Sequence, residues 1–328
     1  MKRIVVYGLG SLGMSIAKEL KKREERKQFH IVAFMDKQEF KNQDEFEIVK
    51  PDALRELQYD NIVVTSEKWF KEIFEELHSK YGVESEKVMH LNELIEEGEY
   101  FCNLCETTVP FMLDTGIESP VFIKRNIVGG GKREKCVCPL CGSLDRERWL
   151  QYILENEIKL YNQEAVVLHF APERQIEAKL RKNQRLTYIT ADIEEGRADR
   201  IEDITKINFP DRSFDYIICN HVLEHIEDEK SAFAELKRCI KVGGKIIFSV
   251  PICWDIDTLE DASVVSEEDR LREYGQKDHV RLYGKDIKTR LETYGFSVQS
   301  MKVSDILSSA QIESMRLIPQ DTIWLLTL

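Results

Sequence analysis

Three histidine and carboxylate positions in one short stretch have the residue types and spacing that chemistry requires. In CNHVLEHI, residues 219–226, His221, Glu224 and His225 follow directly on the apolar run FDYIIC. Imidazoles and carboxylates move protons near neutral pH and also bind divalent metal ions. If a helical turn begins here, Glu224 and His225 lie on the face of His221. The stretch indicates a proton-transfer site or a metal triad, and for His225 simple packing of the loop is the structural alternative.

Cysteines form a second cluster, in the middle of the chain. Five of the eight cysteines lie between residues 102 and 141, and four of these form the pairs CNLC and CPLC. A Cys-x-x-Cys spacing lets two thiolates on one tight turn reach the same tetrahedral ion. A loop with free thiols, redox chemistry and an iron–sulfur cluster are the alternatives, and Cys136 is a competing thiol. The spacing predicts a structural zinc site with the ligands Cys102, Cys105, Cys138 and Cys141.

The composition is that of an ordinary globular protein with an acidic balance. Of the 328 residues 42% are hydrophobic and 32% are charged, and the net charge is −12. Such a chain gives no general reason to expect nucleic-acid binding, which needs a basic surface. The first residues run straight into a predicted strand and no apolar run reaches about 18 residues, so we expect neither signal peptide nor membrane span. We therefore predict a cytoplasmic protein, in which clustered cysteines indicate metal rather than disulfides.

The elements that position these clusters begin with a strand, a glycine turn and a helix in residues 3–20, RIVVYGLGSLGMSIAKEL. The turn GLGSLG ends at Gly13, and Asp36 closes the next predicted strand 23 residues later, close to the spacing of nucleotide-binding domains. The pattern predicts a dinucleotide or sugar-nucleotide site. A fold retained for scaffolding or for homodimer formation is the alternative.

The alternation of strands and helices is interrupted once. Residues 100–148 are rich in cysteine, glycine and proline and need a staple such as zinc, because they show little periodicity. From residue 149 to 328 the alternation resumes. The predicted fold class is α/β, with two Rossmann-like doubly wound domains at 1–99 and 149–328 joined by a small zinc-binding segment at 100–148.

Polar residues close several predicted strands of the C-terminal domain. HFAPE, residues 169–173, ends the first strand, and Asp192 ends the second about 20 residues later, where a carboxylate can accept from a ribose. Asp203 lies in the following loop, and Asn220 and His221 end the next strand. Carboxyl ends of strands line the ligand crevice of an open α/β sheet, so we expect these residues to lie together. Capping of a helix or loop is the alternative for either aspartate.

The stretch FPDRSFDYIICNHVLEHIEDEKSAFAELKRCIKVGGKIIFSVP resembles the class I S-adenosylmethionine-dependent methyltransferases, and the resemblance covers about residues 150–328. It implies S-adenosylmethionine as cofactor. The first turn lacks the glycine-rich form common in that family, and a methyl donor without pyrophosphate needs less close backbone approach. By position, the resemblance implies that the ribose lies against Asp192 and the adenine against Asp203 and Ile204. The methionine moiety is expected to lie against Phe170, Ala171, Pro172, Glu173 and Asn220.

Three further stretches, CPLCGSLDRERW, LHFAPE and GQKDHVRLYG, together resemble a bacterial subgroup of this family that has a zinc knuckle and is linked to surface-glycan synthesis. The resemblance implies O-methylation of a sugar, a sugar nucleotide or a glycan-linked metabolite. Two other functions stay open. One is an NAD(P)-dependent oxidoreductase that works through the N-terminal domain, and the other is a non-catalytic module that only binds S-adenosylmethionine.

A hydroxyl acceptor of a methyl group needs a base that removes its proton. His221 and His279 are the candidates, and we favour His279 because Asp278 adjoins it and can orient the imidazole. In the same loop, we expect Arg281 to hold an anionic substrate group and Tyr283 to contact a sugar. A solvated, salt-bridged loop is the structural alternative.

Overall fold

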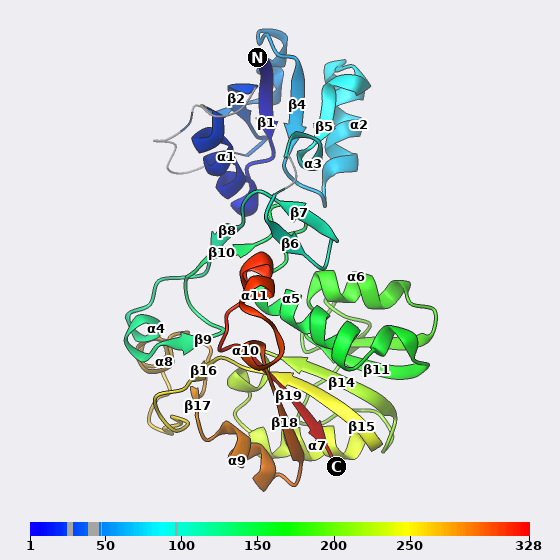
Figure 1. Ribbon diagram of the computed structural model, residues 1–328, viewed down its shortest axis with the longest axis vertical. Coiled ribbons are helices and arrows are strands. Elements are labelled where there is room, and N and C mark those ends of the chain that lie inside the picture. Colours follow the sequence, from blue (N-terminus) through cyan, green and yellow to red (C-terminus); the bar gives the residue numbers. More distant parts are fainter. Residues whose placement is uncertain (25–28, 39–45, 47, 96–97) are drawn as a thin grey trace. The chain divides into compact units, whose positions relative to one another are not determined.

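The structure is a computed structural model that describes residues 1–24, 29–38, 46, 48–95 and 98–328. The chain divides into two compact units. The first consists of Met1–Asp114 and Lys135–Gly142, and the second of Thr115–Glu134 and Ser143–Leu328. Strands alternate with helices in both units, which confirms the predicted α/β class (Figure 1). The segment 100–148 is shared between the units, and the predicted three-part division stays a prediction.

The first unit is built on a five-stranded parallel sheet in the order β3-β2-β1-β4-β5. Its strands alternate with helices and bury Val5, Tyr7, Ile62 and Val64 in one core, since β-branched and aromatic side chains suit a buried pleat. The elements are β1 (Lys2–Tyr7), α1 (Ser11–Glu24), β2 (Phe29–Met35), β3 (Ile48–Val49), η1 (Pro51–Arg55), β4 (Asn61–Val64), α2 (Phe70–Tyr81), η2 (Ser85–Lys87), β5 (Val88–His90) and α3 (Leu91–Leu94).

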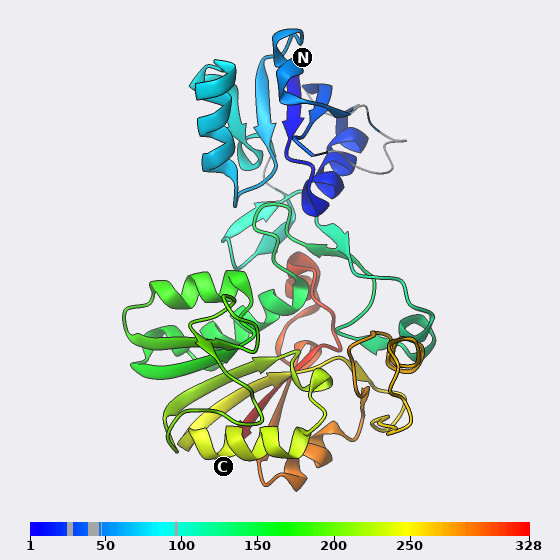
Figure 2. The ribbon, with the colours of Figure 1, turned by 180° about the vertical axis from the view of Figure 1, so that it is seen from behind.

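The middle of the chain carries short elements. An antiparallel hairpin of β6 and β7 precedes a two-stranded sheet of β8 and β10. Strand β9 belongs to a three-stranded sheet with β16 and β17, next to which α4 packs on α8 (Figures 1 and 2). The bounds are β6 (Tyr100–Cys102), β7 (Thr107–Val109), β8 (Leu113–Thr115), α4 (Pro120–Arg125), β9 (Ile127–Val128), β10 (Arg133–Val137), β16 (Ile252–Cys253), α8 (Glu267–Tyr274) and β17 (Tyr283–Gly284).

The second unit contains a seven-stranded sheet in the order β13-β12-β11-β14-β15-β19-β18. Only β19 runs antiparallel to its two neighbours, so the other strands end at a common edge. Helix α6 covers one face and α7 the other (Figure 1). The strands are β11 (Ala165–Phe170), β12 (Leu186–Asp192), β13 (Arg200–Ile201), β14 (Phe214–Asn220), β15 (Ile240–Ser249), β18 (Ser297–Lys302) and β19 (Thr322–Thr327).

The helices of this unit bury one stripe each, as for Phe233 and Leu236 of α7. They are α5 (Asp145–Tyr152), η3 (Ile153–Glu157), η4 (Leu160–Asn162), α6 (Arg174–Lys182), η5 (Leu223–His225), α7 (Glu229–Cys239), α9 (Ile287–Thr293), α10 (Val303–Ile306) and α11 (Ser309–Met315). In the part of the chain that the structure describes, no helix combines the length and the apolar composition of a membrane span.

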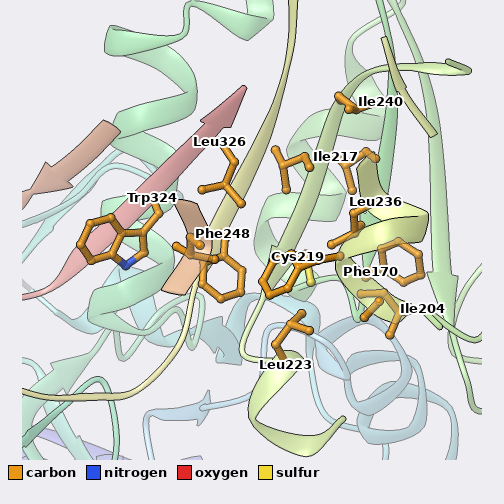
Figure 3. Close-up of a cluster of buried hydrophobic side chains, with 14 of the residues drawn as sticks. Phe170, Ile204, Ile217, Cys219, Leu223, Leu236, Ile240, Phe248, Trp324 and Leu326 are labelled. Carbon is orange, nitrogen blue, oxygen red and sulfur yellow. The ribbon is translucent and has the colours of Figure 1, made fainter. Parts of the chain in front are cut away.

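A single hydrophobic cluster supports the carboxyl edge of this sheet. Figure 3 shows Phe170, Cys219 and Phe248 meeting in it, with Leu223 just beyond the strand ends. Strands β11 and β14 are covered on both faces, which explains why AVVLHF and FDYIIC are almost continuously apolar. The polar residues that follow these strands therefore start from rigid, buried supports.

Candidate active site

The strand register brings the predicted strand ends to one edge. Phe170 of β11 lies opposite Ala191 of β12 and Cys219 of β14. Asn220 lies opposite Ser249, the last residue of β15. The turn after Phe170, the carboxylate of Asp192 and the amide of Asn220 therefore follow neighbouring strands at the same end of the sheet, as the sequence indicated.

A chain of hydrogen bonds links the turn after β11 to the ends of β14 and β15. Glu173 accepts from His169 Nε2 at 2.8 Å and from Asn220 Nδ2 at 3.4 Å, and Asn220 Oδ1 accepts from Ser249 Oγ at 2.8 Å. Burial acts to raise the pKa of Glu173, but the hydrogen bond and charge of His169 outweigh it and leave the pKa below its usual range. Glu173 is thus an ionised group that fixes Asn220 in one orientation.

Tyr188 completes the network, because its hydroxyl lies 2.8 Å from His169 Nδ1. Sequence analysis missed both Tyr188 and Ser249. Ser249 closes a strand and so carried the same positional signal as Asp192, whereas nothing local marks Tyr188.

Two non-glycine residues at this edge adopt left-handed backbone conformations. Ala171 has φ 46° and His221 has φ 53°. Their amides continue the ladders, donating to the carbonyls of Ala191 and Ser249, both at 2.8 Å. A left-handed conformation costs a residue with a Cβ about 1–2 kcal/mol, and such strain collects at functional sites. The turn after β11, which lacks glycine, therefore has at Ala171 the left-handed backbone conformation that glycine adopts most easily.

Asp192 and Asp203 both bond to their own loops. Asp192 Oδ1 accepts from the Glu194 amide at 2.9 Å, while its Oδ2 has no hydrogen-bond partner among the described residues. Asp203 Oδ1 accepts from both the amide and the hydroxyl of Thr205, at 2.8 and 2.7 Å. Ile204 is buried in the hydrophobic cluster. Asp192 thus has one oxygen without a partner among the described residues, while Asp203 caps its own loop.

The histidines of the opening motif surround Glu224, which is buried in η5. His221 Nδ1 lies 3.3 Å from Glu224 Oε1, and Glu224 Oε2 is a buried atom without a hydrogen-bond partner among the described residues. One potential ligand atom each of Glu224, His225 and His279 lies within 4.8 Å of the others. The predicted cluster is therefore compact, with His279 added to it from a distant loop.

Burial dominates the protonation of this cluster. It raises the pKa of Glu224 to about 8 and lowers the pKa of His279 to about 4, the latter with the help of the nearby His225. Burial, followed by the charges of Arg146 and Arg133, also holds the pKa of His221 well below its usual value. Both His221 and His279 are neutral at pH 7, and a neutral imidazole can accept a proton.

The predicted orientation of His279 by Asp278 is wrong in this geometry. Asp278 Oδ2 lies 3.3 Å from Nδ1 of His225, and among the described residues it forms no hydrogen bond with His279, on which it acts only by a charge that opposes the larger effect of burial on the pKa. The His279 ring is buried and packs edge-on against the His225 ring at 4.8 Å. Asp278 lies in a turn, where neighbouring side chains need not share a direction, so sequence adjacency did not imply a contact.

Arg281 and Tyr283 are also placed differently from the prediction. Arg281 is buried and makes five hydrogen bonds of 2.6–3.1 Å within the protein, to the carbonyls of Leu223, Ile226 and Glu227 and to the carboxylate of Glu260. A guanidinium has five N–H donors, so none is left for a substrate anion. The hydroxyl of the buried Tyr283 donates to Glu229 at 2.5 Å. Arg281 thus supports the turn that carries Glu224, and Tyr283 is tied to the start of α7.

Replacing Arg281 by glutamine is therefore expected to destabilise the second unit by about 3–5 kcal/mol, because it leaves three backbone carbonyls without their donor and Glu260 with Arg290 as its remaining partner. Arg270 is the control. It pairs with the exposed Glu227 at 3.1 Å, and Arg270→Gln should cost at most about 1 kcal/mol. Urea denaturation followed by circular dichroism measures both. Equal midpoints for the two variants would contradict the structural role of Arg281.

The four predicted cysteine ligands meet in the first unit. Cys102 Sγ lies 3.6 Å from Cys141 Sγ, and Cys105 Sγ lies 3.8 Å from Cys138 Sγ. Thiolates around a tetrahedral zinc with bonds of about 2.3 Å are about 3.8 Å apart, so the sulfur positions fit the ion. Cys136 does not belong to this cluster. The cluster matches the predicted set of four, and zinc in it stays a proposal.

The glycine turn of the first unit has a structural explanation. A Cβ at Gly13 would lie 1.8 Å from the carbonyl oxygen of Gly8, so helix and strand approach too closely for any side chain. Asp36 accepts from the Leu9 amide at 2.5 Å and from the Gln38 amide at 2.8 Å. Both carboxylate oxygens are thus engaged within the protein, which favours a scaffold over a ribose site.

The comparisons with known proteins divide the chain in a similar way. A family model described as a methyltransferase domain matches residues 155–248, and one described as C2185-like, N-terminal, matches residues 1–89. Residues 155–248 of the second unit are thus similar to a methyltransferase domain, which supports the resemblance that the sequence indicates. The matched range includes the edge with Glu173, Asp192 and Asn220 and the cluster around Glu224, but not His279.

Among curated proteins, an uncharacterized methyltransferase of Schizosaccharomyces pombe is 26% identical over 111 residues, 34% of this chain and 38% of that protein. An uncharacterized protein of Methanocaldococcus jannaschii is 34% identical over 88 residues, 27% of this chain and 40% of that protein. The matches thus span well under half the length of these relatives. A solved S-adenosylmethionine-dependent methyltransferase of Archaeoglobus fulgidus is 19% identical, covering 57% of this chain and 95% of its own, with a TM-score of 0.38.

Proposed function

We propose that the second unit transfers a methyl group from S-adenosylmethionine to a hydroxyl of a small acceptor, a sugar, sugar nucleotide or glycan-linked metabolite. The observation that carries the proposal is the carboxyl edge of its sheet. There Glu173, Asn220 and the free oxygen of Asp192 follow neighbouring strands inside a methyltransferase domain. A cytoplasmic location, a homodimer and a link to surface glycans stay predictions of the same proposal.

The methyl donor would lie across this edge. The strained turn at Ala171 brings the backbone close to the methionine moiety, the network of Glu173 fixes Asn220 beside it, and Asp192 accepts from the ribose. The protein supplies rigid acceptors for the donor's ammonium and hydroxyl groups, and rigid placement is a large part of catalysis in a displacement reaction.

Asp192→Ala is expected to weaken S-adenosylhomocysteine binding by about 5-fold to 150-fold, since a hydrogen bond of a charged acceptor contributes about 1–3 kcal/mol. Isothermal titration calorimetry measures the affinity. Asp211→Ala, which removes an exposed carboxylate paired with Arg238, should leave it unchanged. Equal affinities of the two variants would remove the ribose role of Asp192.

For the base, we propose His221 in place of the favoured His279. His221 follows Asn220 directly. Glu224 is protonated at neutral pH, and its carbonyl oxygen Oε1 can accept from Nδ1–H of His221, which leaves Nε2 to accept the proton. As the acceptor oxygen forms its bond to the methyl carbon, the sulfonium bond breaks and S-adenosylhomocysteine leaves as a neutral thioether. The acceptor proton moves to His221, and solvent removes it afterwards.

A divalent metal is the second candidate for activating the acceptor. The unpartnered buried oxygen of Glu224, with His225 and His279, offers a carboxylate and two imidazoles, a donor set that suits first-row divalent ions. A bound ion would lower the pKa of an acceptor hydroxyl. This set replaces His221 of the sequence-derived triad by His279. Loss of turnover in EDTA, restored by manganese or magnesium with zinc still bound, would favour it.

The remaining functions are separated by simple measurements. An oxidoreductase would require NAD binding to the first unit, whose Asp36 is already engaged. A module that only binds the methyl donor would gain thermal stability with S-adenosylhomocysteine and yet transfer no labelled methyl group. The four-cysteine site is proposed to be structural in every case, because four thiolates leave a zinc ion no open position.

A further inference from the structure

A cavity of about 780 Å³ in the second unit has a lining opposite in charge to the protein as a whole. Its wall combines the segment before β10, the residue after β16, the start of α9 and the ends of β18 and β19. The chain carries a net charge of −12, yet no carboxylate lines the cavity in the part that the structure describes. Five cationic side chains do: Lys132, Arg133, Lys285, Lys288 and Lys302.

Two of these cations have close partners outside the cavity. Lys132 pairs with Glu118 at 2.6 Å, and Arg133 pairs with the buried Asp145. Such pairs hold the cations in place and neutralise part of their charge.

The other three cations are held loosely. Lys285 and Lys288 are more than half exposed and lie 3.9 and 3.8 Å from their carboxylates, and ion pairs of this kind contribute little. Lys302, at the end of β18, forms no ion pair with any residue that the structure describes. Like charges around one hollow repel each other and create a potential that attracts anions. The positive charge of the lining is therefore not balanced by the protein, and an anionic ligand can balance it.

Aromatic side chains form the adjoining wall. Trp254 and Trp324 lie with ring centroids 6.4 Å apart, and the indole N–H groups of both are buried without a partner among the described residues. Trp324 is fixed from behind by Phe248, its cross-strand neighbour (Figure 3). Trp324 is only 3% exposed, so the partly buried Trp254 is the indole on which a ligand ring can pack. An indole beside cations is suited to a molecule that joins a ring to phosphate groups, because rings pack on indoles while phosphates bind ammonium groups.

The cavity adjoins the candidate base. Gly130 lines the cavity, and the preceding Gly129 lies so close to His221 that a Cβ on it would be 3.5 Å from the imidazole Cε1. Lys302 and Ser249 end strands of the same direction, so the cavity and the proposed methyl-donor edge lie at one end of the sheet. An acceptor anchored in the cavity can thus extend toward His221.

We infer that this cavity binds the phosphate-bearing part of the acceptor, a small molecule in which a diphosphate is attached to a ring system. This inference rests on the proposed function and assigns the anion to the lysines of the cavity, the role that sequence analysis gave to Arg281. The volume is in the range of about 300–1,000 Å³ typical of small-molecule sites. A nucleic acid would need a basic surface that continues beyond the cavity, and the acidic chain does not favour it.

The test uses the full-length protein with uridine diphosphate and pyrophosphate as probes, measured by calorimetry and by quenching of tryptophan fluorescence. We expect both probes to bind, with affinity falling as salt rises. The double variant Lys288→Ala/Lys302→Ala should bind uridine diphosphate about tenfold more weakly or worse. Lys230→Ala, on exposed α7, is the matched control and should not change it. Trp254→Phe should reduce the quenching.

Each other outcome overturns the inference. If uridine diphosphate does not bind at millimolar concentration, or sulfate competes as well as pyrophosphate, the cavity holds adventitious anions only. If a single-stranded RNA binds more tightly than uridine diphosphate and loses affinity in the double variant, the ligand class is wrong. Binding of S-adenosylhomocysteine is measured in parallel. If the unaltered protein does not bind it, the proposed function is refuted independently of the inference about the cavity.

Discussion

His221→Ala is expected to lower kcat for methyl transfer by about 10²-fold to 10⁴-fold while the affinity for S-adenosylhomocysteine stays nearly unchanged, as for loss of a general base. The base acts only on the acceptor proton, whereas the donor is held by Asp192 and the turn at Ala171. Single-turnover assays with labelled S-adenosylmethionine measure the first quantity and calorimetry the second. His225→Ala separates this role from the metal candidate. It should leave kcat nearly unchanged if His221 is the base, and lower it if a metal held by Glu224, His225 and His279 activates the acceptor.

The pH dependence adds an independent criterion. Burial and the charges of Arg146 and Arg133 lower the pKa of His221, so its imidazole is unprotonated at neutral pH. A base is active in its unprotonated form, so His221 should cause no loss of rate above about pH 7, and the rate should fall only below the ordinary histidine range, near about 6.5. A further change near pH 8 would report the ionisation of Glu224 beside it. If His221→Ala keeps near-normal turnover across this pH range, His221 is not the base. The acceptor would then be activated by a metal ion or by positioning alone.

Cys138→Ser is expected to remove zinc and to open the first unit around its cysteines. Structural zinc sites in small domains contribute about 10–16 kcal/mol of apparent binding energy, part of which is folding energy. Metal analysis should find about one zinc per chain in the unaltered protein and a small fraction of that in the variant. Chelation should likewise make the segment that follows β6 sensitive to protease.

Cys136→Ser is the control for this experiment. Cys136 is buried and close in sequence, but it lies outside the four-sulfur cluster. Its replacement should therefore leave the zinc content unchanged. Equal zinc contents in the Cys136 and Cys138 variants, or none in the unaltered protein, would contradict the structural zinc site.

Much of the candidate site could be predicted because its signals are local. The two cysteine pairs each lie on one tight turn, and the polar residues that end β11, β12 and β14 follow from the strand pattern alone. Parallel strands end at one edge by construction, so Glu173 and Asn220 meet even though they are 47 residues apart. The similarity of residues 155–248 to a methyltransferase domain could be predicted for the same reason.

The loop around His279 could not be predicted, because side-chain direction there depends on distant backbone. Arg281 bonds to carbonyls 54 to 58 residues earlier, which no local pattern reveals. The charge of Arg281 suggested a contact with an anionic substrate, whereas its burial in the structure shows a structural role. The basic cavity was missed for a similar reason: its lysines come from separate segments, and each of them is unremarkable in sequence.

The interleaving of the two units has a consequence for how the protein is made. The chain leaves the first unit after Asp114 and returns at Lys135, where the Lys135 amide donates to Asp114 Oδ1 at 2.8 Å. During translation, Cys102 and Cys105 emerge well before Cys138 and Cys141, with part of the second unit between them. The first unit therefore cannot complete its four-cysteine cluster when only its own sheet has been made, and truncation at residue 114 would leave two of the four cysteines of that cluster. Excising it intact would instead require joining residue 114 to residue 135 and ending the chain after Gly142.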